Sequence, residues 1–197
     1  GPYPITLKGY SGDKTNSVKY TGQMARHVLH DSLKALVKTG DVSKMMAYYN
    51  GEDGLEIVAP KSKDDFAIKQ TMVSEIGSGN LSGKTYKGAI AGWGNLTGPE
   101  VLEHMMTKAG EVEGGFDPNT GFDYTQLISK FAMGAVFYNQ AVNNYLGKKM
   151  EIGQKPNNKP YKDGAYYTGK EHSWDEAFGY WGSAAHALTL SAEQNYN

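Results

Sequence analysis

The spacing of hydrophobic residues along the chain predicts a series of helices. Apolar residues recur at the 3.6-residue period of a helix in these segments: 17–38, 66–76, 99–109, 123–147 and 173–188. A shorter helix is expected over 42–50. No segment shows the sustained alternation of apolar and polar residues that indicates a strand. We therefore predict an all-α fold, a helical bundle with little or no sheet.

Capping residues predict where several of these helices begin and end. Asp41 and Asp123 are good N-caps, because a short side-chain oxygen can accept from the free backbone N–H groups of a first turn. Gly40 can close the first helix in a left-handed conformation. The sequence 62–65 resembles a capping box, and Pro99 suits the first residue of the fourth helix.

Glycine is abundant, and its distribution predicts two long loops. The chain of 197 residues has 25 glycines, and seven of them fall within 77–98, a density that no packed helix tolerates. The second loop, 147–171, has six lysines interleaved with Tyr161, Tyr166 and Tyr167. It is interpreted as a lid, a partner contact or a solvated loop. We treat 1–197 as a single helical domain with long glycine-rich loops.

Charge and composition exclude several classes of function. Lys and Arg total 20 and Asp and Glu total 21, so the formal net charge is -1 and a nucleic-acid partner is not favoured. No apolar run approaches the length of about 18 to 20 residues that a transmembrane helix needs. Cysteine is absent, which excludes disulfides, thiolate metal sites and a cysteine nucleophile.

The strongest candidate site is formed by His172, Asp175 and Glu176. On a helix the spacings of three and four residues place an imidazole and a carboxylate on one face. That arrangement suits two ligands of a metal, or a histidine oriented by a carboxylate. The alternative is structural: Ser173 and Glu176 fit a capping box, which would leave His172 just outside the helix. The sequence leaves the functional and the structural interpretation open.

Two weaker pairs share this chemistry. His27 and Asp31 are four residues apart, as are Glu100 and His104, so each pair could contribute to a metal site. Segment 78–85 only approximates a phosphate-binding loop and lacks its strand and helix. Segment 117–123 only approximates a calcium loop, and a turn followed by an N-cap is expected there. The H-E-x-x-H motif of zinc peptidases does not occur.

Three segments carry a family resemblance that spans nearly the whole chain. Segments 16–26, 128–140 and 171–180 resemble the DUF4856 family, whose members are bacterial exported proteins and often lipoproteins. The family is distantly similar to the imelysin-like proteins, which are helical periplasmic or surface proteins linked to iron uptake. These carry a Gly-x-His-x-x-Glu motif followed by Trp-Gly. The matching positions here are His172, Asp175 or Glu176, and 181–182.

The resemblance implies a fold, a location and a function. It implies an imelysin-like helical bundle in the periplasm or at the cell surface. It implies a non-enzymatic protein that binds iron, haem or another divalent metal, with His172, Asp175 and Glu176 at the site. The alternatives are a structural or assembly protein and a metal-dependent peptidase. The resemblance also suggests the N-terminal half of a longer architecture, with a partner chain or a second copy covering the last helix.

Overall fold

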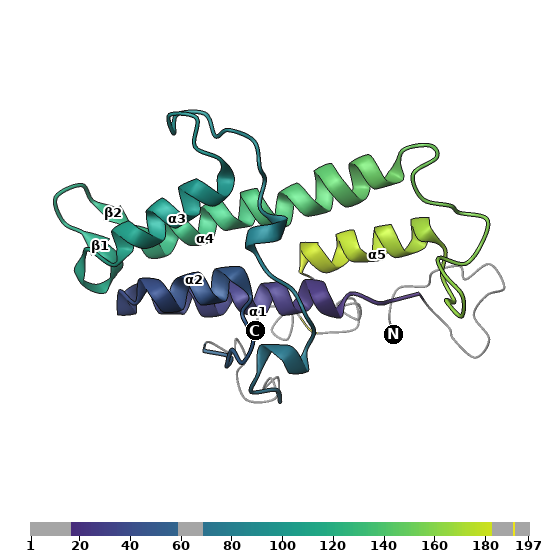
Figure 1. The fold of residues 1–197 in the computed structure, drawn as a ribbon, viewed down its shortest axis with the longest axis horizontal. Helices are drawn as coiled ribbons and strands as arrows, with labels where there is room; N and C mark the ends of the chain where they lie inside the picture. Colours follow the sequence, from purple (N-terminus) through teal and green to yellow (C-terminus); the bar gives the residue numbers. More distant parts are fainter. Residues whose placement is uncertain (1–16, 59–68, 183–190, 192–197) are drawn as a thin grey trace.

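The computed structural model describes residues 17–58, 69–182 and 191, and this part of the chain is mostly helical (Figure 1). Its α-helices are, in chain order, α1 (Thr21–Leu36), α2 (Val42–Asn50), α3 (Gly98–Ala109), α4 (Tyr124–Ala132) and α5 (Gly169–Trp181). A π-helix, Met133–Gly147, continues α4 without a break. Short 3-10 turns lie at Val37–Thr39, Val73–Glu75, Ser82–Lys84, Glu113–Gly115 and Lys148–Met150.

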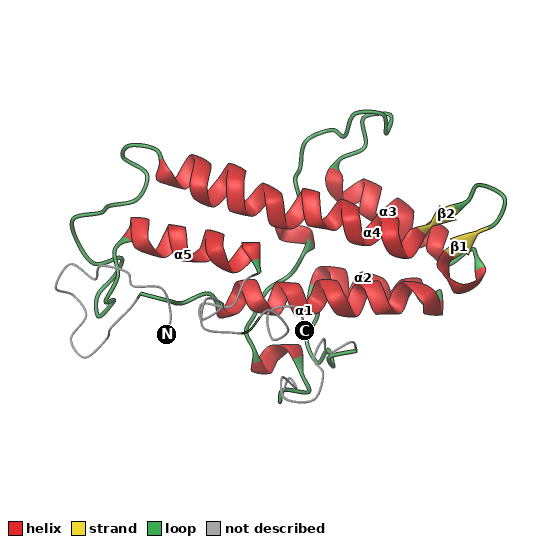
Figure 2. Cartoon of the chain, turned by 180° about the vertical axis from the view of Figure 1, so that it is seen from behind, coloured by secondary structure: helices red, strands yellow, loops and turns green. Residues whose placement is uncertain are grey.

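Within the described residues the only sheet is a small hairpin at one end of the molecule (Figure 2). Strand β1 (Phe116–Asp117) pairs antiparallel with β2 (Phe122–Asp123). The Asp117 carboxylate accepts from the Asn119 N–H and the Thr120 hydroxyl, and Asp123 caps α4 by accepting from the Gln126 N–H. The predicted turn followed by an N-cap is confirmed.

The packing of the helices defines the architecture. Helix α1 contacts α2, α4 and α5, α3 packs on α2 and α4, and α5 lies along the π-helix. The core between them includes Leu29 and Leu33 of α1, Leu102 of α3, and Ile128 and Val136 of the long helix, all fully buried. Among the described residues, no helix is both long enough and apolar enough to cross a membrane.

Local capping signals predicted several helix ends correctly. The Asp41 side chain accepts from the Lys44 N–H at the start of α2, and Gly40 is left-handed at the end of the preceding 3-10 turn. The predicted helix over 66–76 is wrong for its described part. There, Ile57 donates to Thr71 O and Val73 donates to Leu55 O, so this backbone pairs with an upstream segment instead of with itself. The predicted cap at 62–65 lies outside the described residues.

The long helix was predicted correctly in position but not in its buried face. Its second half has π-helical hydrogen bonding, in which each bond spans one residue more than in an α-helix and the turn is wider. Because a π-helix has more residues per turn, the apolar residues that are spaced at the α-helical period gradually turn away from the core along this segment. Tyr138, Val142 and Leu146 belong to the apolar stripe that the α-helical period draws along 123–147, yet they are exposed, whereas Gln140 is buried. The wider turn leaves an apolar strip of the π-helix on the surface.

The glycine-rich loop 77–98 packs closely against the end of α2, and the Leu81 N–H donates to Tyr49 O there; this close approach gives a test of the fold. Gly51 ends α2 with a φ of 64°, and a Cβ there would lie 2.2 Å from Gly79 O. We predict that Gly51→Ala lowers the free energy of unfolding by about 3 kcal/mol or more, since it adds a clash to left-handed strain. The matched control is Gly54→Ala, with a φ of 76° and open space, which should cost about 1 kcal/mol. Urea unfolding measures both, and equal losses would contradict the close contact.

Candidate functional site

Helix α5 begins earlier than predicted, and this changes the setting of the strongest candidate site. Thr168 is its N-cap: the hydroxyl accepts from the Glu171 N–H, while the Glu171 carboxylate accepts from the Thr168 N–H. The predicted capping box of Ser173 and Glu176 is therefore wrong. The physical reason is that Thr168 and Glu171 form the same motif upstream. His172 consequently lies inside the helix.

His172 and Glu176 share one face of α5, as their spacing predicted. The His172 Nε2 lies 3.7 Å from the Glu176 Oε1. The rings of Tyr161 and Tyr167 pack on the imidazole with centroids at 5.0 and 4.7 Å. Burial lowers the pKa of His172, although the charge of Glu176 opposes that shift. Its Nδ1 is buried without a hydrogen-bond partner, so a neutral imidazole is enclosed here by aromatic rings.

Asp175 does not join this pair. Its side chain is buried and its Oδ2 accepts from the backbone N–H of Lys19 at 2.6 Å. Glu176 accepts from the Gln23 side chain at 3.1 Å. Both carboxylates thus fasten α5 to the start of α1. Within the described ranges, no group of three His, Asp or Glu side chains is arranged to hold a metal ion.

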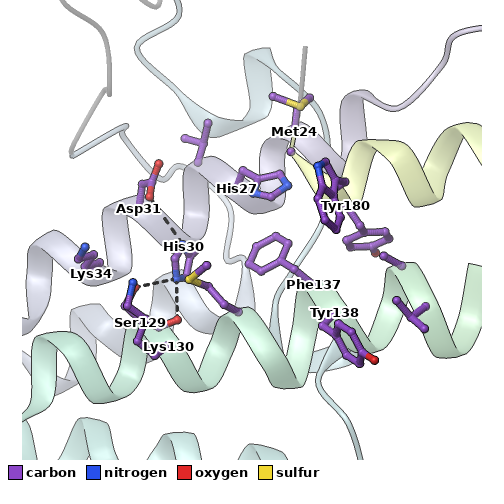
Figure 3. Close-up of a pocket in the computed structure, with 16 residues that line it drawn as sticks. Met24, His27, His30, Asp31, Lys34, Ser129, Lys130, Phe137, Tyr138 and Tyr180 are labelled. Carbon is purple, nitrogen blue, oxygen red and sulfur yellow. Dashed lines mark hydrogen bonds and ion pairs between the residues drawn. The ribbon is translucent and has the colours of Figure 1, made fainter. Parts of the chain in front are cut away.

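A cavity of about 750 Å³ lies between α1, the π-helix and the C-terminal end of α5 (Figure 3). We call it the α1–π groove. Two residues singled out in the sequence, His27 and Asp31, line it. The other residues that define its chemistry are Met24, His30, Lys34, Lys130, Met133, Phe137, Tyr138, Tyr180 and Trp181.

The histidines of the groove are held by specific contacts. The His27 ring stacks on Phe137 at 4.3 Å, and its Nε2 lies 3.0 Å from Gly179 O. A carbonyl only accepts, so this Nε2 carries the proton and Nδ1 keeps a lone pair. Burial lowers the pKa of His27, which favours the neutral ring. His30 lies between Ser129 O at 3.2 Å and Asp31 Oδ1 at 3.6 Å.

The wall and the rim of the groove differ in character. Met133, Tyr138 and Trp181 expose 48, 60 and 76% of their surface. Such high exposure of neighbouring apolar and aromatic side chains often marks a binding surface. Lys34 and Lys130 add basic groups at one end. An apolar cavity with a few polar groups is the usual form of a ligand site. The arrangement suits a flat apolar ligand that carries acidic groups.

The remaining predicted pair has a structural role. The Glu100 carboxylate accepts from both the backbone N–H and the hydroxyl of Thr97, which caps α3. His104 is exposed and its ring meets Trp93 edge-on. The two side chains therefore do not act together.

Sequence reasoning missed the groove and the role of the lysine-rich loop. The groove needs the π-helical rotation of Tyr138 and the approach of Trp181 to α1, and neither is encoded by local spacing. Tyr138 lay within the predicted apolar stripe, so the sequence carried no signal of its exposure. The loop contributes Tyr161 and Tyr167, which pack on His172.

Comparison with known proteins gives one match. Residues 9–196 match the family described as a domain of unknown function, DUF4856. No curated protein and no solved structure matches the chain. The imelysin-like arrangement of the helices therefore stays a prediction.

The two buried histidines predict how stability depends on pH. Folding lowers the pKa of His27 and His172 below the usual value of 6.5. Below pH 6.5 the unfolded chain takes up protons that the folded chain resists, so stability falls as the pH decreases from 7 to 5. The slope contributed by each group is at most about 1.4 kcal/mol per pH unit.

The test compares two variants. His172→Gln should flatten the dependence of the unfolding free energy on pH, whereas His104→Gln at an exposed position should leave it unchanged. Denaturant titrations at several pH values measure both slopes. If His172→Gln had the same slope as the wild type, the burial of a neutral imidazole would be disproved.

Proposed function

The chain belongs to the DUF4856 family, and from that premise we propose that it is a non-enzymatic, extracytoplasmic binding protein for iron, carried as haem or another metal complex. The resemblance of the family to imelysin-like proteins supports the location and the metal. The α1–π groove supports the position of the ligand. The proposal involves no catalytic step.

The observation that carries this proposal is the donor chemistry of the groove. A histidine nitrogen and methionine sulfurs are the axial ligands of many haem proteins. His27 retains a lone pair on Nδ1, and the thioethers of Met24 and Met133 line the same cavity. The volume of about 750 Å³ falls within the usual range for small-molecule sites, roughly 300 to 1,000 Å³.

The rest of the groove also fits a haem. Phe137, Tyr138 and Trp181 provide aromatic surface for a planar ring. Lys34 and Lys130 can pair with carboxylates of the ligand. The residues that line the α1–π groove therefore suit a haem. The site at His172, Asp175 and Glu176 stays a second prediction for a bare metal ion, because the His172 Nδ1 has no hydrogen-bond partner.

Titration with haem tests the proposal and separates the two positions. We expect saturable binding with a new Soret band, and at least a tenfold weaker Kd for His27→Ala, about 1.4 kcal/mol. His104→Ala, outside the groove, should bind like the wild type. Melting temperatures with Fe, Zn and Cu for His172→Ala address the second position. Absence of haem binding together with no metal-dependent shift would refute the function itself.

One observation favours a second function, assembly with a partner chain. The exposed apolar strip of Met133, Tyr138, Val142 and Trp181 borders the groove on the π-helix and on the end of α5. Contiguous exposed apolar surface of this kind is typical of protein interfaces. In this alternative the strip binds a partner or a second copy of the chain.

Light scattering across a range of protein concentrations tests the assembly function. If the strip is an interface, the molar mass rises with concentration, and Trp181→Ser lowers the association constant at least tenfold, about 1.4 kcal/mol. Ile152 is fully exposed and does not line the groove, so Ile152→Ser is the matched control. A constant monomer mass at all concentrations would exclude self-association.

A further inference from the structure

On the side of α5 that carries Glu176, four cationic side chains gather from four separate segments. Arg26 belongs to α1, Lys84 and Lys149 to two 3-10 turns, and Lys155 to the lysine-rich loop. We call these four the cationic cluster. The charges of Arg26 and Glu176 act on Lys84, and those of Glu176, Lys155 and Lys84 act on Lys149. The charge of Glu176 thus acts on Lys84 and Lys149, and four cations against one carboxylate leave a local excess of positive charge.

The lysines of the cluster are not ordinary surface lysines. Lys84 and Lys149 are half-buried, and burial lowers the pKa of both, that of Lys149 to about 8. The Lys149 Nζ lies 3.4 Å above the ring centre of Tyr145, and Lys155 lies 5.6 Å from that of Tyr161. Neither Lys84 nor Lys149 forms an ion pair with a carboxylate of the described residues. A half-buried, unpaired ammonium group is costly in a folded protein.

A buried hydroxyl points to a ligand independently of the charges. Tyr180 is 1% exposed, yet its hydroxyl oxygen has no hydrogen-bond partner. Arg26 and Glu176 both act electrostatically on this hydroxyl, so it lies on the same side as the cluster. Unsatisfied buried donors are rare in native proteins. The side chain of Tyr145 lies beside it but forms no hydrogen bond of normal geometry, so the Tyr180 O–H is available to a ligand oxygen.

The local contacts hold the cluster in place. The Arg26 Nε donates to Asn80 O, and its guanidinium lies 5.7 Å from the centre of the Tyr180 ring. The backbone carbonyl of Lys84 accepts from the Gln140 side chain, and that of Lys149 accepts from Lys170. Glu176 is itself held by Gln23. Positioned cations with little freedom lose little entropy when an anion binds.

We propose that the cationic cluster binds a compact oxyanion with two or more negative charges, of the phosphate or polycarboxylate class. Lysines act as point charges toward such groups, and arginine offers its fork of N–H donors. Glu176 offsets only one of the four positive charges, so the remaining positive charge attracts a multivalent anion more strongly than a monovalent one. The site rests on the cationic cluster and does not depend on the function proposed for the α1–π groove.

Calorimetric titration with inorganic phosphate, sulfate and citrate at low ionic strength tests the site. We expect at least one of these anions to bind with a Kd below about 10 mM, and the separate titrations distinguish phosphate from polycarboxylate. Lys149→Met and Lys84→Met should each weaken binding at least tenfold. The exposed neighbours give matched controls: Lys148→Met and Lys87→Met should change the Kd less than twofold.

Stability measurements separate a binding role from a structural one. Without anion, Lys149→Met should melt no lower than the wild type, because it removes an unpaired half-buried charge. With anion, the wild type should gain stability by mass action and Lys149→Met should not. The Kd for haem in the α1–π groove should be the same for the wild type and for Lys149→Met. The proposal is overturned if none of the three anions binds, or if Lys148→Met weakens binding as much as Lys149→Met.

Discussion

The contact between α5 and α1 at Gly179 determines most of what this fold can do. A Cβ at Gly179 would lie 2.6 Å from the Cβ of Tyr20, so only glycine lets the two helices approach this closely. The same crossing carries the bonds from the Lys19 N–H to Asp175 and from His27 to Gly179 O. It sets how far Trp181 reaches toward α1, and therefore the width of the α1–π groove.

The sequence predicted the features that depend on neighbouring residues. The caps at Asp41 and Asp123 and the left-handed Gly40 follow from local backbone chemistry, and each was identified correctly. The mostly helical fold followed from periodicity. The predicted helix over 66–76 failed because its backbone pairs with residues 55–57, a contact with no local signal. The start of α5 was misplaced because two capping motifs, at Thr168 and at Ser173, compete within one segment, and sequence alone does not rank them.

The candidate site shows the same division. Spacing correctly placed His172 and Glu176 on one face of the helix. It could not show that the Asp175 carboxylate accepts a hydrogen bond from the backbone N–H of Lys19, in another segment. The groove depends on the π-helical turn, which rotates Tyr138 outward and Gln140 inward. The cationic cluster depends on four distant segments meeting at α5. Periodicity finds a helix and its faces, whereas tertiary packing decides which face receives which partner.

Tyr180 links the α1–π groove to the cationic cluster. Its ring borders the α1–π groove, while its hydroxyl lies with Arg26 and Glu176 among the cations. One aromatic side chain is therefore shared by the groove and the cluster. A movement of this ring that accommodates a ligand at one of them also changes the surroundings of the other. By thermodynamic reciprocity, the influence of either occupant on the affinity for the other is equal in both directions.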